Sequence, residues 1–66
     1  MKIEAESTDR YLVTVSLGEL RLINNCINDA MDLMEDAEFQ TRTGGFKDDA
    51  RTLLKTIQAA LRPRPA

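Results

Sequence analysis

Apolar and polar side chains alternate in two short segments near the start of the chain, residues 2–6 and 11–15. Alternation with a period of two, with many β-branched residues, predicts strands that bury one face. The turn-forming residues 7–9 lie between them, so the two segments are expected to form a β-hairpin. The apolar face of this hairpin would carry Ile3, Ala5, Tyr11, Val13 and Val15.

The pattern changes to a helical period at Ser16. Ser16 and Glu19 fit the S-x-x-E capping box, in which each side chain bonds the backbone N–H of the other residue. A long helix is therefore predicted from Ser16 to about Ala37, with apolar residues around about half of its circumference. Its main apolar side carries Leu20, Ile23, Ile27, Ala30, Met31 and Met34. Beside this main side lie Leu22, Cys26 and Leu33, which we call the apolar shoulder.

Two further elements are expected in the second half of the chain. Residues 38–42 (EFQTR) fit a short third strand, and Gly44 and Gly45 break the chain after it. A narrow apolar stripe then predicts a helix over residues 46–62, which Pro63 ends. The predicted fold is α+β, ordered ββαβα, with both helices on one face of a small sheet. Residues 1–62 would form a single domain, with 63–66 as a frayed tail of proline and arginine.

A chain of 66 residues buries too little surface to be more than marginally stable alone. Cys26 is the only cysteine and histidine is absent, so an internal disulfide and a Cys/His metal site are excluded. Oligomerisation or a partner protein is the support that remains. The charged N-terminus and the absence of a long apolar run predict a cytoplasmic protein with no membrane association.

Charge is divided unevenly along the chain. Residues 17–38 hold six acidic side chains and one arginine, whereas residues 39–66 hold six basic and two acidic ones. Two interpretations remain open. The acidic and basic helices complement each other within the fold, or the acidic surface is kept for a basic partner.

Catalytic groups are scarce in this sequence. Histidine-assisted nucleophilic catalysis is excluded, and no glycine-rich phosphate loop is present. Asp29, Asp32 and Asp36 share a helix face, but one straight helix cannot surround a hard cation, so a solvated or protein-binding face is favoured. The basic flank of the last helix lacks aromatic residues and net positive charge, which disfavours nucleic-acid binding. We therefore expect no enzyme, no metal and no cofactor.

Three asparagines, Asn24, Asn25 and Asn28, fall within five residues of the first helix. Asparagine is a poor helix former, because its side chain competes for backbone hydrogen bonds. In one interpretation Asn24 and Asn28 bond loop or strand backbone at the edge of the core. In the other, Asn25 and Asn28 serve an interface beside the acidic patch.

The run LGELRLINNCIN at residues 17–28, followed by EFQTRTG at 38–44, resembles a class of short bacterial proteins. These have an L-x-x-L-N-N-x-L-N helix, an E-F-x-T-R-x-G segment and a C-terminal helix. The class is associated with the small immunity proteins of bacterial polymorphic toxin systems. The resemblance implies a protein that binds and blocks a toxin inside the producing cell. Small phage inhibitors of bacterial defence have the same size and acidic character.

The sequence thus leads to one main functional hypothesis, a non-enzymatic inhibitor that blocks a protein target by steric occlusion. The target would be a basic toxin or a nucleic-acid-binding effector. The alternative is a homodimeric assembly module of a larger complex, built through the apolar side of the first helix. The predicted binding residues, for self-association or a foreign partner, are Leu22, Asn25, Cys26, Asn28, Asp29, Asp32, Leu33 and Asp36.

Overall fold

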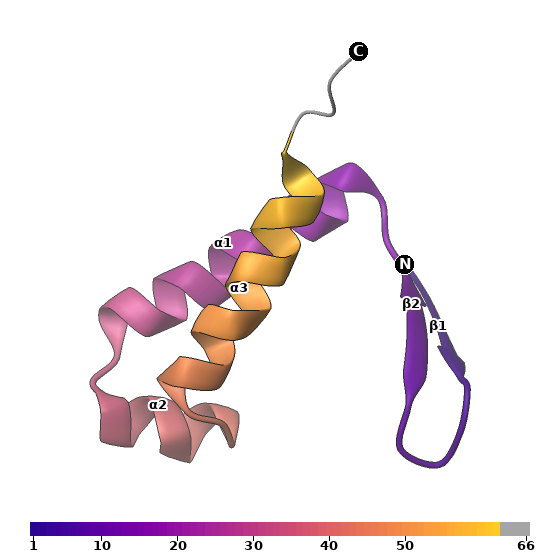
Figure 1. The fold of residues 1–66 in the computed structure, drawn as a ribbon. Coiled ribbons are helices and arrows are strands. Elements are labelled where there is room, and N and C mark those ends of the chain that lie inside the picture. Colours follow the sequence, from indigo (N-terminus) through magenta and orange to yellow (C-terminus); the bar gives the residue numbers. More distant parts are fainter. Residues whose placement is uncertain (63–66) are drawn as a thin grey trace.

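A computed structural model describes residues 1–62 as an α+β protein with a two-stranded hairpin followed by three helices (Figure 1). The strands are β1 (Lys2–Ala5) and β2 (Tyr11–Thr14). The helices are α1 (Leu17–Leu33), α2 (Asp36–Thr43) and α3 (Lys47–Leu61). The tail predicted at residues 63–66 lies outside the described residues.

The hairpin and its apolar face match the prediction, but the helices do not cover that face. Ile3 stands opposite Val13 and Ala5 opposite Tyr11, so these four side chains share one face, as their alternation indicated. Every residue of both strands is nonetheless exposed, because α1 and α3 pack against each other and not on the sheet. The expectation that both helices cover one face of the sheet was therefore wrong.

The predicted third strand and the predicted end of the first helix were also wrong. Helix α1 ends at Leu33, two extended residues follow, and residues 36–43 form helix α2. Phe39 explains the break, since it comes seven residues after Asp32 and eleven after Asn28, on the polar face of a continuous helix. The change of direction at Met34 and Glu35 instead buries Phe39, which is only 5% exposed. Burying an aromatic side chain outweighs the few helical bonds lost at the break.

Residues 36–43 form a helix because no strand lies beside them. The hydroxyls of Thr41 and Thr43 donate to the carbonyls of Ala37 and Phe39, at 2.9 and 2.7 Å. These bonds satisfy the threonine hydroxyls inside the helix without adding to its stability. Gly44 ends the helix in the left-handed conformation, with a φ of 76°, which suits glycine.

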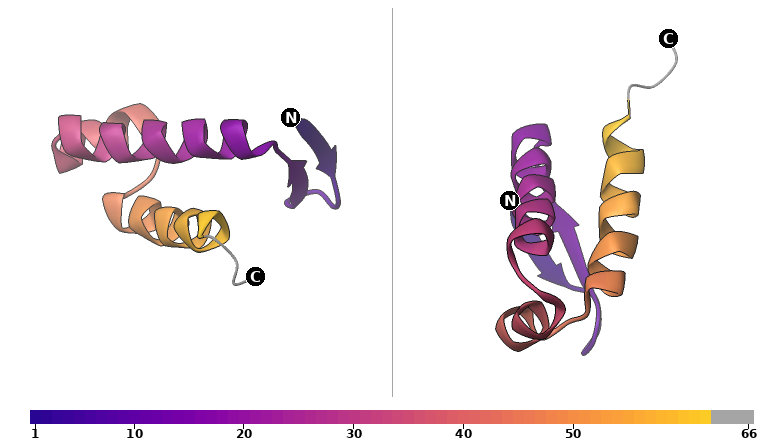
Figure 2. Two further views of the ribbon diagram at one scale, coloured as in Figure 1. Left: turned by 90° about the horizontal axis from the view of Figure 1, so that it is seen from above. Right: turned by 90° about the vertical axis from the view of Figure 1, so that its left-hand side faces the viewer.

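The core lies where α2 and α3 meet and where α3 packs along α1. Helix α3 matches its prediction closely, with Phe46 before its first residue and Arg62 after its last. Phe39, Leu54 and Ile57 are the buried apolar residues, and α1 contributes none of them. The hairpin stands beyond the start of α1, away from α2 (Figure 2). The radius of gyration is 13.6 Å, against about 11 Å for a compact chain of this length.

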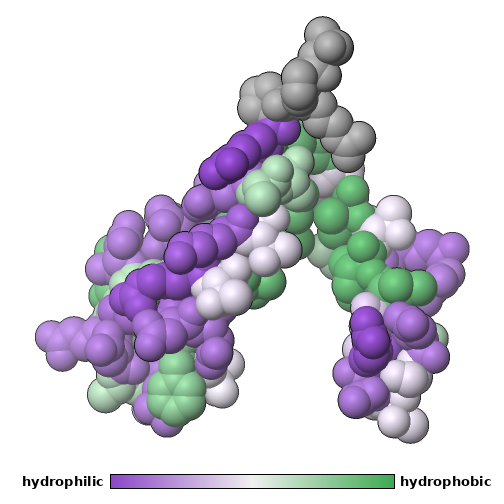
Figure 3. All heavy atoms as spheres, viewed as in Figure 1, coloured by the Kyte–Doolittle hydropathy of each residue, from purple (hydrophilic) through white to green (hydrophobic). Residues whose placement is uncertain are grey.

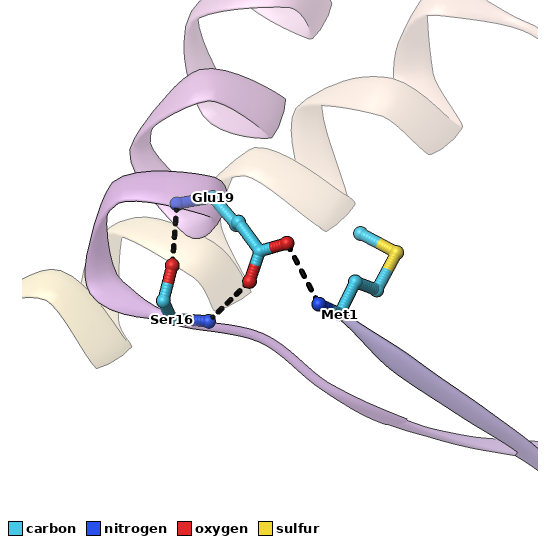
Figure 4. Close-up of polar contacts among 3 residues, drawn as sticks. All are labelled: Met1, Ser16 and Glu19. Atoms are coloured by element: carbon cyan, nitrogen blue, oxygen red, sulfur yellow. Dashed lines mark hydrogen bonds and ion pairs between the residues drawn. The ribbon is translucent and has the colours of Figure 1, made fainter.

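One carboxylate joins the hairpin to helix α1 (Figure 4). The predicted capping box is present: Ser16 Oγ accepts from the Glu19 N–H at 3.1 Å, and the Ser16 N–H donates to Glu19 Oε1 at 2.8 Å. The other oxygen, Glu19 Oε2, accepts from the terminal amine of Met1 at 2.8 Å. The amine, followed by the Ser16 N–H and hydroxyl, lowers the pKa of Glu19 from 4.5 to about 2. Glu19 therefore caps α1 and holds the first residue of the chain beside it.

Phe39→Ala is expected to destabilise the protein by about 3–5 kcal/mol, because it empties a buried aromatic site. A domain of this size has about 3–10 kcal/mol of stability in total, so most of the helical fold is expected to be lost. Phe46→Ala is the matched control, since Phe46 is 59% exposed. Urea unfolding followed by circular dichroism measures both. Equal losses in the two variants would contradict the buried position of Phe39.

The contribution of Glu19 to the stability of the fold is expected to decrease as pH falls. Because its folded pKa lies below the ordinary 4.5, the contribution is complete above about pH 4.5 and disappears as pH falls toward 2. Wild type should therefore melt above Glu19→Gln at neutral pH, and the two melting temperatures should converge in this acidic window. Glu6→Gln, in the hairpin loop, serves as the control. A difference that persists unchanged at pH 2 would rule out the carboxylate as its source.

Candidate functional site

The apolar shoulder of α1 is uncovered in the structure. Leu22 is 63% exposed, Leu33 is 82% exposed, and the Cys26 thiol is also exposed. These side chains lie along one stripe of the helix, and Asp29 lies in the same stripe between Cys26 and Leu33. An apolar stripe with a carboxylate inside it is thus open to a partner.

A pocket of about 360 Å³ opens beside this shoulder, between α1, α2 and α3. Cys26 belongs to both the shoulder and the pocket. Asp49 is the only charged residue in its lining, and Thr43 and Gly45 lie at the turn that joins α2 to α3. The remaining lining residues are apolar: Cys26, Ile27, Ala30, Phe39, Phe46, Ala50 and Leu53. We call the pocket and the shoulder together the apolar groove.

Two contributors to the apolar groove, Phe46 and Leu53, were not recognised as site residues in the sequence. Both belong to the apolar stripe that predicted the last helix. The structure leaves Phe46 59% and Leu53 51% exposed, whereas Leu54 and Ile57 of the same stripe are buried. The apolar pattern gives the stripe but not which of its members another helix covers, so the sequence carried no signal for these two residues.

The acidic residues of the predicted site are separated by the break in the helix. Asp29 and Asp32 remain on α1, whereas Asp36 begins α2 and pairs with Lys47 of α3 at 3.3 Å. The Asp36–Lys47 pair is one place where acidic and basic parts of the chain neutralise each other within the fold. Among residues 1–62, no salt bridge involves Asp29 or Asp32. These two carboxylates are therefore available to a basic partner.

The asparagines do not make the backbone bonds considered for them. Asn24 Nδ2 donates to Asn25 Oδ1 at 3.4 Å, a long bond, and Asn24 Oδ1 is buried without a hydrogen-bond partner in the described chain. Asn25 and Asn28 are exposed on the polar side of α1. Asn25 and Asn28 are thus accessible, but they lie on a different side of α1 from the apolar shoulder.

Basic residues of α3 are partly neutralised by neighbouring carboxylates. Lys47 pairs with Asp36, and Arg51 pairs with Asp48 three residues earlier on the same helix. The side of α3 turned to the viewer in Figure 3 is largely hydrophilic. Within residues 1–62 there is no group of three acidic, cysteine or histidine side chains placed to hold a metal ion. No helix in this part of the chain has the length and apolar character to cross a membrane.

Comparison of the chain with models of protein families, with curated proteins and with solved structures yields no match. The resemblance to small immunity proteins therefore stays a prediction. What the structure contributes is an open apolar groove beside two carboxylates without ion-pair partners.

Cys26 gives a direct chemical measure of how open the groove is. Its exposed thiol is expected to react with a neutral maleimide in native buffer within a few-fold of the rate in the urea-unfolded chain. A neutral reagent is needed, because Asp29 and Asp49 would repel an anionic one. Labelling can be followed by mass spectrometry. Protection by orders of magnitude would contradict an open groove.

Proposed function

We propose that this protein is a non-enzymatic inhibitor that binds one protein target through the apolar groove and blocks it by steric occlusion. The observation that carries the proposal is the continuity of the exposed shoulder with the pocket at Cys26. Contiguous exposed apolar surface on a small protein marks an interaction site. A groove formed by three helices suits an apolar anchor from a partner, surrounded by polar contacts.

The acidic flank supports a basic target. Asp29 lies within the apolar stripe, so a lysine or arginine of the partner would meet it where water is partly excluded. Asp32 lies close by, toward the polar side, where it would accelerate encounter with a positively charged surface. A toxin or an effector that binds nucleic acid has such a surface. This chemistry agrees with the resemblance to immunity proteins, and an anti-defence protein would use it in the same way.

Occlusion is the mechanism that the chemistry of the chain favours. A tightly bound domain prevents access to the surface that it covers without any catalytic group of its own. Binding would also stabilise the inhibitor, because a partner that binds only the folded chain shifts the unfolding equilibrium. Because the domain buries few side chains, its free energy of unfolding is small, and the stabilisation from binding would be large in comparison.

The decisive experiment compares substitutions on the groove with one elsewhere on the same helix. The Leu22→Ser, Leu33→Ser double variant is expected to weaken target binding at least ~10-fold, as loss of anchor residues does. Leu17→Ser is the matched control, because Leu17 is 56% exposed and lies on another face of α1. Tagged proteins are used to recover the target from the native host, and its yield is measured by quantitative mass spectrometry.

One outcome of this experiment supports the proposal and two overturn it. A stoichiometric partner retained by Leu17→Ser and lost from the double variant supports the proposal. Equal recovery with both variants, or recovery of no stoichiometric protein other than the chain itself, overturns it. The last outcome would favour the alternative of a homodimeric assembly module. Circular dichroism confirms that each variant keeps its helices, as surface substitutions should.

A further inference from the structure

The hairpin is tied to helix α1 by the ion pair between the Met1 amine and Glu19, but its strands are not covered by any other element of the described chain. Its strands have four residues each, and all eight are exposed. An isolated two-stranded hairpin is only marginally stable in water, and a third strand or a packed layer is needed to support it. Here its apolar face, with Ile3, Ala5, Tyr11 and Val13, remains exposed. The hairpin is therefore expected to gain its third strand from outside the chain.

The two free edges of the hairpin differ in chemistry. In a two-stranded sheet each strand leaves one edge unpaired. Strand β1 carries Lys2 and Glu4, which pair at 2.8 Å, and charged side chains of this kind discourage further pairing. Strand β2 (YLVT) has no charge, proline or glycine. Of the two, β2 has the edge suited to receive another strand.

The hydrogen-bond pattern identifies the groups on that edge. The Glu6 N–H donates to the Arg10 carbonyl at 2.9 Å, which makes these residues a hydrogen-bonded pair beside the loop. Bonded and non-bonded pairs alternate along an antiparallel ladder. The pairs Ala5–Tyr11 and Ile3–Val13 are then non-bonded. The backbone N–H groups of Tyr11 and Val13 consequently point to the free edge of β2, and that of Ile3 to the free edge of β1.

The chain exposes more surface than a folded monomer of its mass normally does, which leaves area for self-association. The accessible surface of the chain is 5672 Å², against about 4,200 Å² for a folded monomer of this mass. The difference, about 1,500 Å², includes all exposed surfaces of the chain, the apolar groove among them. A standard specific interface buries about 800 Å² from each partner.

We propose that β2 pairs antiparallel with β2 of a second copy, which joins the two hairpins into one four-stranded sheet. Antiparallel pairing of a strand with itself has twofold symmetry, so one edge supplies both halves of the interface. The apolar faces of both hairpins then become continuous. Strand β2 is the strand nearer the helices in Figures 1 and 2, and the space-filling view shows an open gap beside the hairpin (Figure 3). The second hairpin would enter this gap.

This self-association does not depend on the proposed function. It uses the edge of β2, whereas target binding uses the apolar groove on α1 and α3, so a dimer would present two grooves. Substitutions in the groove would leave the dimer intact, and substitutions on the β2 edge would leave the groove intact. Failure of either proposal can thus be recognised separately.

Two proline substitutions at cross-strand positions test the proposal by sedimentation equilibrium at micromolar concentration. Val13→Pro removes an N–H from the β2 edge without removing a bond of the hairpin ladder, a position where proline is tolerated. Ile3→Pro makes the same change on the β1 edge. Wild type and Ile3→Pro are expected to sediment as dimers, and Val13→Pro as a monomer, with self-association weakened at least ~10-fold.

A second substitution guards against an effect of proline on the hairpin itself. Val13→Lys keeps the N–H but places like charges near each other across the twofold axis, so its dimer should be weaker at low salt and recover at high salt. Cross-strand contacts between residues 4 and 12, measured by nuclear magnetic resonance, show whether each variant keeps its hairpin. A wild-type monomer, or a dimer abolished by Ile3→Pro and kept by Val13→Pro, would overturn the proposal.

Discussion

The helical half of the molecule depends on the burial of one side chain, Phe39. In a continuous helix Phe39 would lie on the polar face, because it follows Asp32 and Asn28 at helical spacing. The chain instead leaves the helix after Leu33 and restarts it at Asp36, which turns Phe39 into the core. That turn determines where α2 lies, from which α3 returns along α1. Phe39 also lines the pocket, so the candidate site exists because of the same break.

Packing with so few buried residues leaves much of the apolar surface open. Helix α1 has apolar residues on about half of its circumference, but α3 covers only one side of it. The shoulder, and Phe46 and Leu53 across the pocket, consequently remain exposed. A larger domain buries such residues under another element, and the hairpin does not cover them here. The exposed apolar surface thus follows from how few elements of the described chain pack together.

The molecule presents two open surfaces of different character at opposite ends of α1. The apolar groove, near α2, offers side chains and is flanked by Asp29 and Asp32, which form no ion pair among residues 1–62. The hairpin, at the start of α1, offers backbone groups along an uncharged edge, which favours an identical strand. Glu19 links the hairpin to the helix through both of its carboxylate oxygens. The two surfaces therefore lie on one molecule and share no residue.

The sequence by itself determined the local structure. Alternation determined the hairpin and its apolar face, and the capping box determined where α1 begins. The apolar stripe determined α3, and the shoulder of Leu22, Cys26 and Leu33 was recognised as excess before any cover was known. Only the tertiary structure decided that residues 38–42 are helical, that the sheet is uncovered, and that Phe46 and Leu53 complete a groove. The physical reason is that local patterns report which side of an element is apolar, whereas its cover depends on contacts between distant segments. Phe39 shows this most directly, since its burial overrides the period of the helix that precedes it.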